Sequence, residues 1–345
     1  MVQCICTCRW KKKEITVIIN ELPLFLEPYI RSQAMQRLAG IDNNCGVNRT
    51  SFPLFAGKTT CTRYHHSILT SLLAWHFTHD TKQALACLFH DIASPVFSHT
   101  VDFAEGDLLK QETTERGIAE ILSSDPIISS QLKQDGISID DVCDYHRYPI
   151  CDNHIPQLSC DRLSYMLTGM NELFCVPKEK IISFVDDITV SKNEYGEEEL
   201  CFQNKDIAVE FTRFCLQCGI IYACCFDRFA MMELADLVND ALSDGVLVYE
   251  DLYTTESYVI DKLKNSTYHD AWRRFESLCG VYLSEKKIEG YRQIRVKKRY
   301  VDPYVIEMGR VSMLDHDIRR SIDLFVNDDQ MIYIKGRRKT WKKQS

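Results

Sequence analysis

The chain has 345 residues, of which 45% are apolar and 26% charged, so it can bury a large core and has the composition of an ordinary globular protein. Its net charge of −8 argues against a general nucleic-acid coat, because phosphate binding depends on clustered Lys and Arg. No stretch approaches the roughly 20 uncharged apolar residues of a membrane-spanning helix, and the apolar segment after Lys11–Lys13 is too short for a secretory signal. We therefore expect a cytoplasmic protein that is not embedded in a membrane.

The 16 cysteines favour reduced, buried thiols over a disulfide framework. They are scattered through apolar, helix-like runs such as the one that contains Cys215 and Cys218, where a thiol behaves as a small hydrophobic group. Three of them, in the segment Cys4–Cys8, suit a soft metal ion. That segment is a weak candidate, because no second Cys/His cluster follows it at the spacing of a zinc finger.

Two neighbouring apolar runs predict helices that present metal-ligand side chains. Ile68, Leu69 and the apolar residues one turn later fall at helical spacing, which places His66 in the first turn of a helix. The next run, Ala84–Phe89, ends at His90-Asp91 and is followed by Ser94-Pro95, and proline disfavours helix at the residue before it. We expect the second helix to stop near the pair. Neighbouring residues on a regular helix point about 100° apart, so both side chains converge more easily where the helix ends.

The remaining segments predict mostly helix with some β-structure. Helical patterns cover 104–122 and 159–170, and one or two long helices are expected over 208–242. A hairpin with a glycine turn is predicted over 188–202. β-like alternation follows in two late segments, 293–296 and 331–334.

The expected organisation is an N-terminal extension, residues 1–23, a core, residues 24–265, and a C-terminal α+β portion, residues 266–345. The last portion ends in the basic segment Lys335–Lys343, which holds one aromatic residue, Trp341. This segment is a candidate tail for a nucleic acid or an acidic partner. A solvated, frayed terminus is the interpretation that the sequence favours.

A histidine, a His-Asp pair and a distant aspartate form a set of nitrogen and oxygen ligands suited to a divalent ion such as Mn, Fe, Zn, Ni or Mg. The pair is His90-Asp91 and the distant residue is Asp161. The residues themselves do not separate His65 from His66, because both stand at a helix start. Other interpretations remain open, since His65 suits a surface position and Asp161 suits an N-cap of the following helix.

Three motifs in this order resemble those of the HD-domain metal phosphohydrolases, and the branch they are most similar to is the deoxynucleoside triphosphate triphosphohydrolases. The motifs are Arg63–Ser67, His90–His99 and Asp161–Tyr165, and the similarity covers about residues 36–264. The resemblance implies a mainly α fold, in which a helical bundle surrounds the metal, with a small β hairpin and an α+β C-terminal portion.

The resemblance also implies roles for individual residues. The implied metal ligands are His66, His90, Asp91 and Asp161, with His66 chosen over His65 because the family's ligand directly precedes the serine of its motif. The implied contacts to substrate phosphates are Arg63, Arg162 and Tyr165, and His99, Asp102 and Glu112 occupy the positions of catalytic or nearby acidic residues. For Arg162, a structural role and phosphate binding are equally supported. For Arg63, phosphate binding is favoured over a structural role.

Two positions differ from the triphosphohydrolase pattern. That branch usually has Gly-His where this chain has Ala93-Ser94, and His-Glu where it has Gln111-Glu112. Serine and glutamine do not replace an imidazole that titrates near pH 7. The resemblance therefore predicts metal binding more firmly than triphosphohydrolase chemistry.

The functional expectation is a metal-dependent phosphohydrolase that acts on a nucleotide or a related phosphate ester by attack of an activated water on phosphorus. The alternative, from a different class, is a nucleotide-binding or regulatory module that keeps the metal site without turnover. A helical scaffold with a purely structural His-Asp pair is the third interpretation. Oligomers are common in the resembling branch, so a homo-oligomer is a further expectation.

Overall fold

The computed structural model describes most of the chain. The described residues are 22–56, 61–98, 100, 117–293, 298–328 and 332–339. The segment Cys4–Cys8 lies outside them. So do the three predicted catalytic residues His99, Asp102 and Glu112, and Gln111, one of the two departures from the family pattern.

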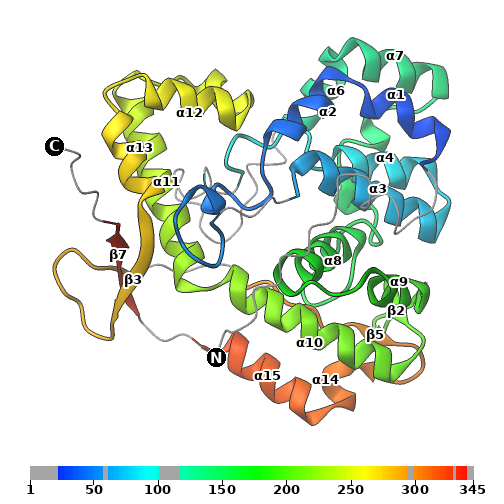
Figure 1. Cartoon of the computed structure of the whole chain (residues 1–345). Helices are drawn as coiled ribbons and strands as arrows, with labels where there is room; N and C mark the ends of the chain where they lie inside the picture. Colours follow the sequence, from blue (N-terminus) through cyan, green and yellow to red (C-terminus); the bar gives the residue numbers. More distant parts are fainter. Residues whose placement is uncertain are drawn as a thin grey trace.

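The fold is mainly α-helical with a few short strands, as the sequence predicts (Figure 1). The helices that form the bundle around the candidate metal centre come mostly from the first two thirds of the chain. Their bounds are η2 Leu24–Leu26, α1 Glu27–Ile30, α2 Gln33–Arg37, η3 Leu38–Gly40, η4 Val47–Arg49, α3 Arg63–Thr78, α4 Thr81–Phe89, α6 Ile118–Ser124, α7 Pro126–Asp135, η5 Ile139–Asp141, η6 Tyr145–Arg147, α8 Cys160–Phe174 and α9 Lys178–Asp186.

Three of these helices carry the candidate site, and local sequence sets their ends. The Asp80 carboxylate caps the start of α4 by accepting hydrogen bonds from the backbone amides of Lys82 and Gln83. The helix ends at Phe89, directly before the His-Asp pair, which confirms the predicted stop. The Ser159 hydroxyl caps α8, so the interpretation of Asp161 as its N-cap is wrong.

The segment 208–242 forms two helices, α10 Lys205–Tyr222 and α11 Cys225–Ser243. Within the residues that the structure describes, no single helix is long and apolar enough to cross a membrane, although this bent pair passes the same test of length and composition. The predicted helix over 104–122 lies mainly outside the described residues. Its visible end belongs to α6, which begins after Gly117.

The predicted hairpin is confirmed as β1 Ile188–Lys192 and β2 Glu198–Phe202, which pair antiparallel. Gly196 has a φ of 79° in the turn between them, a conformation that glycine adopts without steric cost. Two further short strands, β5 Tyr304–Val305 and β6 Gly309–Arg310, extend this sheet in the order β1-β2-β5-β6.

The second sheet contains β3 Leu278–Ser284, β4 Arg292–Gln293 and β7 Tyr333–Arg338, with β7 in the centre. The expectation that the basic C-terminal segment is a frayed end is therefore wrong for Lys335–Arg338, because these residues are held in the central strand. The other C-terminal elements are η7 Tyr249–Tyr253, α12 Glu256–Lys264, α13 His269–Glu276, α14 Val311–Leu314 and α15 His316–Val326.

The buried apolar residues form two clusters. One lies among α3, α4, α8 and α10 and includes Val301 and Ile318 from the C-terminal part. The other lies around α11 and joins Phe52, Trp272 and Ile334. Both clusters draw residues from either side of position 265, and the predicted domain boundaries stay a prediction.

Every cysteine among the described residues is a free thiol, in agreement with the expectation of reduced cysteines. Most of them are buried, and burial raises the pKa of thiols such as Cys87, Cys160 and Cys215 well above the usual value. A thiol with a raised pKa holds little reactive thiolate at neutral pH. These cysteines therefore act as small core residues.

A buried ion pair joins the hairpin sheet to the segment before α8. Arg310 donates two hydrogen bonds to the carboxylate of Glu199, at 2.6 and 2.8 Å. The same carboxylate accepts bonds from the Asn193 side chain and from the backbone amide of Leu158. Glu199 is fully buried, so its charge depends on these partners.

We expect Arg310→Ala to destabilise the protein by about 3 to 5 kcal/mol, because it leaves the buried Glu199 charge without its cation. Urea unfolding followed by circular dichroism measures the change. Arg31→Ala is the matched control, since it breaks an exposed pair with Glu27 on α1 that contributes only about 0.3 to 0.5 kcal/mol. Equal effects of the two substitutions would contradict the structural role of the buried pair.

Candidate metal centre

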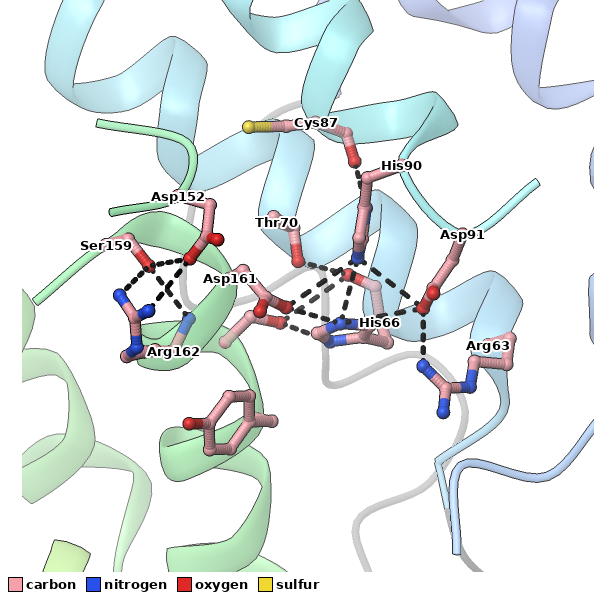
Figure 2. A network of polar contacts seen from close by, with 12 residues as sticks. Arg63, His66, Thr70, Cys87, His90, Asp91, Asp152, Ser159, Asp161 and Arg162 are labelled. Atoms are coloured by element: carbon pink, nitrogen blue, oxygen red, sulfur yellow. Dashed lines mark hydrogen bonds and ion pairs between the residues drawn. The ribbon is translucent and has the colours of Figure 1, made fainter. Parts of the chain in front are cut away.

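Three helices bring two histidines and an aspartate together at a buried point. His66 lies in the first turns of α3, His90 directly follows α4, and Asp161 is the second residue of α8. Figure 2 shows the three side chains pointing toward one another from these separate elements. Their ligand atoms all lie within 4.8 Å of one another.

The distances between these atoms fit a shared cation. The Nε2 atoms of His66 and His90 are 3.2 Å apart. The Asp161 carboxylate oxygen Oδ1 lies 3.0 Å from Nε2 of His66 and 3.6 Å from Nε2 of His90. Metal–ligand bonds of about 2.0 to 2.2 Å place neighbouring ligand atoms roughly 3.0 to 3.5 Å apart. The group therefore has the size of one coordination sphere.

Hydrogen bonds on the far side of each ring direct both Nε2 atoms inward. Nδ1 of His90 lies 2.6 Å from the backbone carbonyl oxygen of Cys87, and a carbonyl only accepts. Nδ1 of His66 lies 2.9 Å from the hydroxyl of Ser164, which itself donates to the His66 carbonyl. Both rings are thus assigned a proton on Nδ1 and a lone pair on Nε2, the tautomer of a metal-ligating histidine.

This arrangement leaves two lone pairs and a carboxylate facing one another in a buried space. Such a concentration of electron-rich atoms is unfavourable unless a proton or a cation lies between them. Two imidazoles and carboxylates are ligands for Zn, Mn, Fe or Ni. The residues present therefore fit a divalent metal ion, which His66, His90 and Asp161 would hold.

Asp91 lies on the edge of this group. Its Oδ2 is 3.4 Å from Nε2 of His90 and 3.8 Å from Nε2 of His66. The same oxygen accepts a hydrogen bond of 2.7 Å from Nη1 of Arg63, and its other oxygen accepts one from Ser94. Asp91 is close enough to both histidines to become a fourth ligand.

Both carboxylates are ionised. Burial by itself would raise the pKa of Asp91, but Arg63 and the two histidines outweigh burial and hold that pKa far below its usual range. The pKa of Asp161 is also lowered, because its contacts with the imidazoles of His66 and His90 outweigh burial. The Asp161 side chain is 19% exposed, compared with 3 to 4% for His66, His90 and Asp91, so the centre is most accessible on the Asp161 side.

The three residues that the resemblance assigns to phosphates lie in different surroundings. Arg63 belongs to the centre, since it donates to Asp91 and also, through Nε, to Ser98. The Arg162 guanidinium instead bonds to the Gln157 carbonyl, the Ser159 hydroxyl and Asp152. Figure 2 shows it directed toward Ser159 and Asp152 and away from His66.

Arg162 therefore stabilises the loop before α8 through these contacts, while its role in phosphate binding stays a prediction. Tyr165 is partly buried, and the Arg299 guanidinium lies 5.7 Å from the centre of its ring. Burial, opposed by Arg299 and Arg162, raises the pKa of this tyrosine to about 12, so its hydroxyl stays protonated and can donate a hydrogen bond.

The structure separates the two adjacent histidines that the sequence left open. Nδ1 of His65 contacts the Thr62 hydroxyl at 2.8 Å, whereas His66 is the histidine in the cluster. The predicted roles of His99, Asp102 and Glu112 concern residues outside the described part of the chain and stay predictions.

Ser164, Cys87 and Tyr145 contribute to the centre without having been predicted. Ser164 holds His66 and could have been found, because it stands one helical turn after Asp161 and so shares its helix face. Cys87 contributes only its backbone carbonyl, which accepts from His90, and a backbone group cannot be recognised from residue type. Tyr145 packs its ring 5.1 Å from the ring of His90, a contact across 55 residues that only the folded chain brings about.

Asp227 lies near the arginine that contacts Tyr165. Burial raises the pKa of this carboxyl to about 7, against the opposing charges of Arg228 and Arg299. Raised pKa values of this kind occur both at functional sites and in structural ion-pair networks. The sequence places Arg228 on a helix, but it does not predict the environment of its neighbour.

Comparisons with known proteins support the fold. No protein-family profile matches the chain. The chain is 25% identical over 295 residues to the uncharacterised protein YdhJ of Bacillus subtilis, a match that covers 81% of this chain and 83% of that protein. Among solved structures it is similar to a phosphohydrolase from Bacteroides thetaiotaomicron, with a TM-score of 0.62, 12% identity and coverage of 93% of this chain and 97% of that one. The chain thus has the fold of a solved phosphohydrolase and a group of residues that fits a metal ion.

We expect Ser164→Ala to weaken metal affinity by about 10- to 100-fold, because removal of a partner that orients a ligating histidine has effects of this size. Titration calorimetry of the metal-free protein with Zn²⁺ or Mn²⁺ measures the change. Ser183→Ala is the matched control, since the Ser183 hydroxyl donates to a backbone carbonyl of its own helix, α9. Unchanged affinity in Ser164→Ala would contradict the assigned orientation of His66.

We expect the stability of the protein to fall as the pH rises from about 4 to above 7, in part because of Asp227. Its folded-state pKa of about 7 exceeds the unfolded value, so the stabilisation is present at low pH and is lost as the folded carboxyl ionises. Asp227→Asn should be more stable than the natural protein at pH 8 and nearly equal at pH 4, as measured by urea unfolding. The same change at the exposed Asp270 should not alter the pH profile.

Proposed function

We propose that the protein is a metal-dependent phosphohydrolase of the HD type that acts on a nucleotide or a related phosphate ester. The observation that carries this proposal is the convergence of the His66, His90 and Asp161 ligand atoms, with both imidazoles held in the metal-binding tautomer. The similarity in fold to the Bacteroides phosphohydrolase supports it. The sequence motifs add the order of ligands expected for this class.

A divalent cation at this position supplies a nucleophile at neutral pH and a Lewis acid for a phosphoryl group. The protein's own residues fix the geometry. Arg63 holds Asp91 ionised and oriented toward the two histidines, and it brings a positive charge to the centre. The Tyr165 hydroxyl, which is protonated at neutral pH, is a neutral donor for a phosphate oxygen.

The approach of a substrate is expected from the side of Asp161, the most exposed residue of the centre. Arg162 stands next to Asp161 and fastens the preceding loop through Ser159 and Asp152. In this role it fixes the start of α8, and thereby the Asp161 carboxylate, in position. A phosphate contact by Arg162 would require it to leave these partners.

Ser94 favours a second candidate function, a nucleotide-binding or regulatory module that keeps the metal site without turnover. This residue is fully buried and donates to Oδ1 of Asp91. It therefore orients a carboxylate and brings no group that titrates near pH 7 to a position where the triphosphohydrolases have a histidine. Such a module binds nucleotides, which raises its melting temperature by mass action, and does not consume them.

We expect purified protein to contain a transition metal and to release phosphate from members of a panel of nucleotides and phosphate esters, because the ligand set both binds the ion and depends on it. Elemental analysis and a phosphate assay measure the two properties. In His90→Ala and Asp161→Asn, both metal content and turnover should fall to background.

His76→Ala is the matched control, since His76 lies on α3 away from the cluster. A result in which nucleotides raise the melting temperature of the metal-loaded protein while none of the panel is hydrolysed would support the regulatory module. It would contradict the proposed enzymatic activity. Protein that binds no metal and keeps normal stability would reject both.

A further inference from the structure

Charge is distributed very unevenly along this acidic chain. Residues 278–299 and 332–345 hold thirteen Lys and Arg and two Glu, whereas the remaining residues hold 28 Lys and Arg and 47 Asp and Glu. The first two segments contain the three strands of the β3-β7-β4 sheet. A protein with an overall charge of −8 thus carries one strongly basic element.

The sheet lies on the opposite side of the molecule from α3 and α4 (Figure 1). Its inner face packs on α11. Ile334 is buried in the second core cluster, and a Cβ atom at Gly336 would lie 2.5 Å from the ring of Phe229, so only glycine allows this close approach. Successive side chains of a strand point to opposite faces. Tyr333, Lys335 and Arg337 of β7 therefore point outward.

The strand register places aromatic and cationic side chains side by side on the outer face. Tyr282 of β3 is directly opposite Lys335 of β7. On the other side of β7, Nζ of Lys335 lies 5.7 Å from the centre of the Tyr291 ring. Lys335 is thus flanked by two tyrosines. The Arg337 side chain extends over Gly280, where a Cβ atom would lie only 2.7 Å from its Nε.

The cations on the two faces differ in their partners. On the inner face, Arg338 pairs with Glu233 and Arg292 pairs with Asp236, both on α11. For Lys335 on the outer face, no carboxylate of the described residues lies within ion-pair distance, and the same holds for Arg337. Both side chains are exposed, and Tyr282 is 50% exposed.

We propose that this outer face, made by Tyr282, Tyr291, Tyr333, Lys335 and Arg337, binds single-stranded nucleic acid. Bases stack on exposed aromatic rings and phosphates pair with the cations between them, a combination that binds single strands with little sequence preference. The charge of the face is complementary to a phosphate backbone and opposite to that of the rest of the chain. Lys286 and Lys287 in the β3–β4 turn and Lys339 after β7 extend the basic surface along both ends of the strands.

The composition of the face favours a nucleic acid over a lipid surface. Its aromatic residues are tyrosines, whereas peripheral membrane segments insert Trp, Phe or Leu. The proposal does not depend on the metal centre, because no ligand of that centre belongs to the sheet. It leads to the expectation that His90→Ala binds a single strand as the natural protein does.

The test is fluorescence anisotropy of the full chain with a labelled oligodeoxythymidylate of about 16 nucleotides, at about 50 and 200 mM salt. EDTA is present so that a phosphodiesterase activity would not consume the probe. We expect salt-dependent binding. Tyr282→Ala should weaken it roughly 5- to 100-fold through loss of stacking. Lys335→Ala should lower the slope of log affinity against log salt by about 0.7, as for one phosphate contact.

Two control variants match these changes in charge and size. Arg320→Ala removes an exposed cation from α15, and Tyr195→Ala removes an exposed aromatic ring from the β1–β2 turn. Both should bind like the natural protein, and the melting temperature of each variant verifies that it is folded.

The proposal is overturned if the natural protein does not bind the oligonucleotide at low salt, or if the controls weaken binding as much as the sheet variants do. It is also overturned if vesicles with phosphatidylserine bind with the same dependence on Tyr282 and Lys335 while the oligonucleotide does not. That result would assign the face to an anionic membrane surface.

Discussion

The candidate centre depends on the close approach of two imidazole nitrogens to a carboxylate in a buried space. The Nε2 atoms of His66 and His90 lie 3.2 Å apart, and an Asp161 oxygen lies 3.0 Å from one of them. In the tautomers that the surrounding hydrogen bonds select, no proton is available to join these atoms. Their arrangement is therefore favourable when a cation binds between them, and the helices around it serve to hold it.

The positions of three helix ends determine this geometry. Because α4 stops at Phe89, His90 can direct Nδ1 to the carbonyl of Cys87 while Asp91 turns toward Arg63. The start of α8 is fixed by the Ser159 cap and by the bonds of Arg162 to the preceding loop. The Glu199–Arg310 pair then connects that loop to the hairpin sheet. A chain of buried polar contacts thus runs from the candidate metal ligands to the C-terminal strands.

Among the described residues, two separate regions of positive charge are those for which we propose phosphate ligands. One is Arg63, buried at the centre and paired with Asp91, which suits a single phosphate near a metal ion. The other is the outer face of the β3-β7-β4 sheet, where cations alternate with tyrosines. The first is suited to chemistry on a small molecule and the second to an extended polyanion. The two proposals therefore rest on different residues and are independent of each other.

Local patterns in the sequence were sufficient for much of the fold. Apolar spacing located α3 and α8, the Ser94-Pro95 stop ended α4 at the His-Asp pair, and a glycine turn located the β1–β2 hairpin. These features depend on residues within a few positions of one another, where backbone sterics and helix periodicity act directly. The types of candidate ligand were likewise readable from side-chain identity.

Contacts between distant segments were decided only by the tertiary structure. The choice between His65 and His66, the commitment of Arg162 to the loop before α8, and the inclusion of Lys335–Arg338 in a central strand each depend on partners far away in the sequence. Side-chain direction at a helix start differs by about 100° between neighbours, and composition does not show whether an arginine or a basic segment finds a partner. Residue identity therefore specified which chemistry was available, while packing across the chain determined which residues were positioned to perform it.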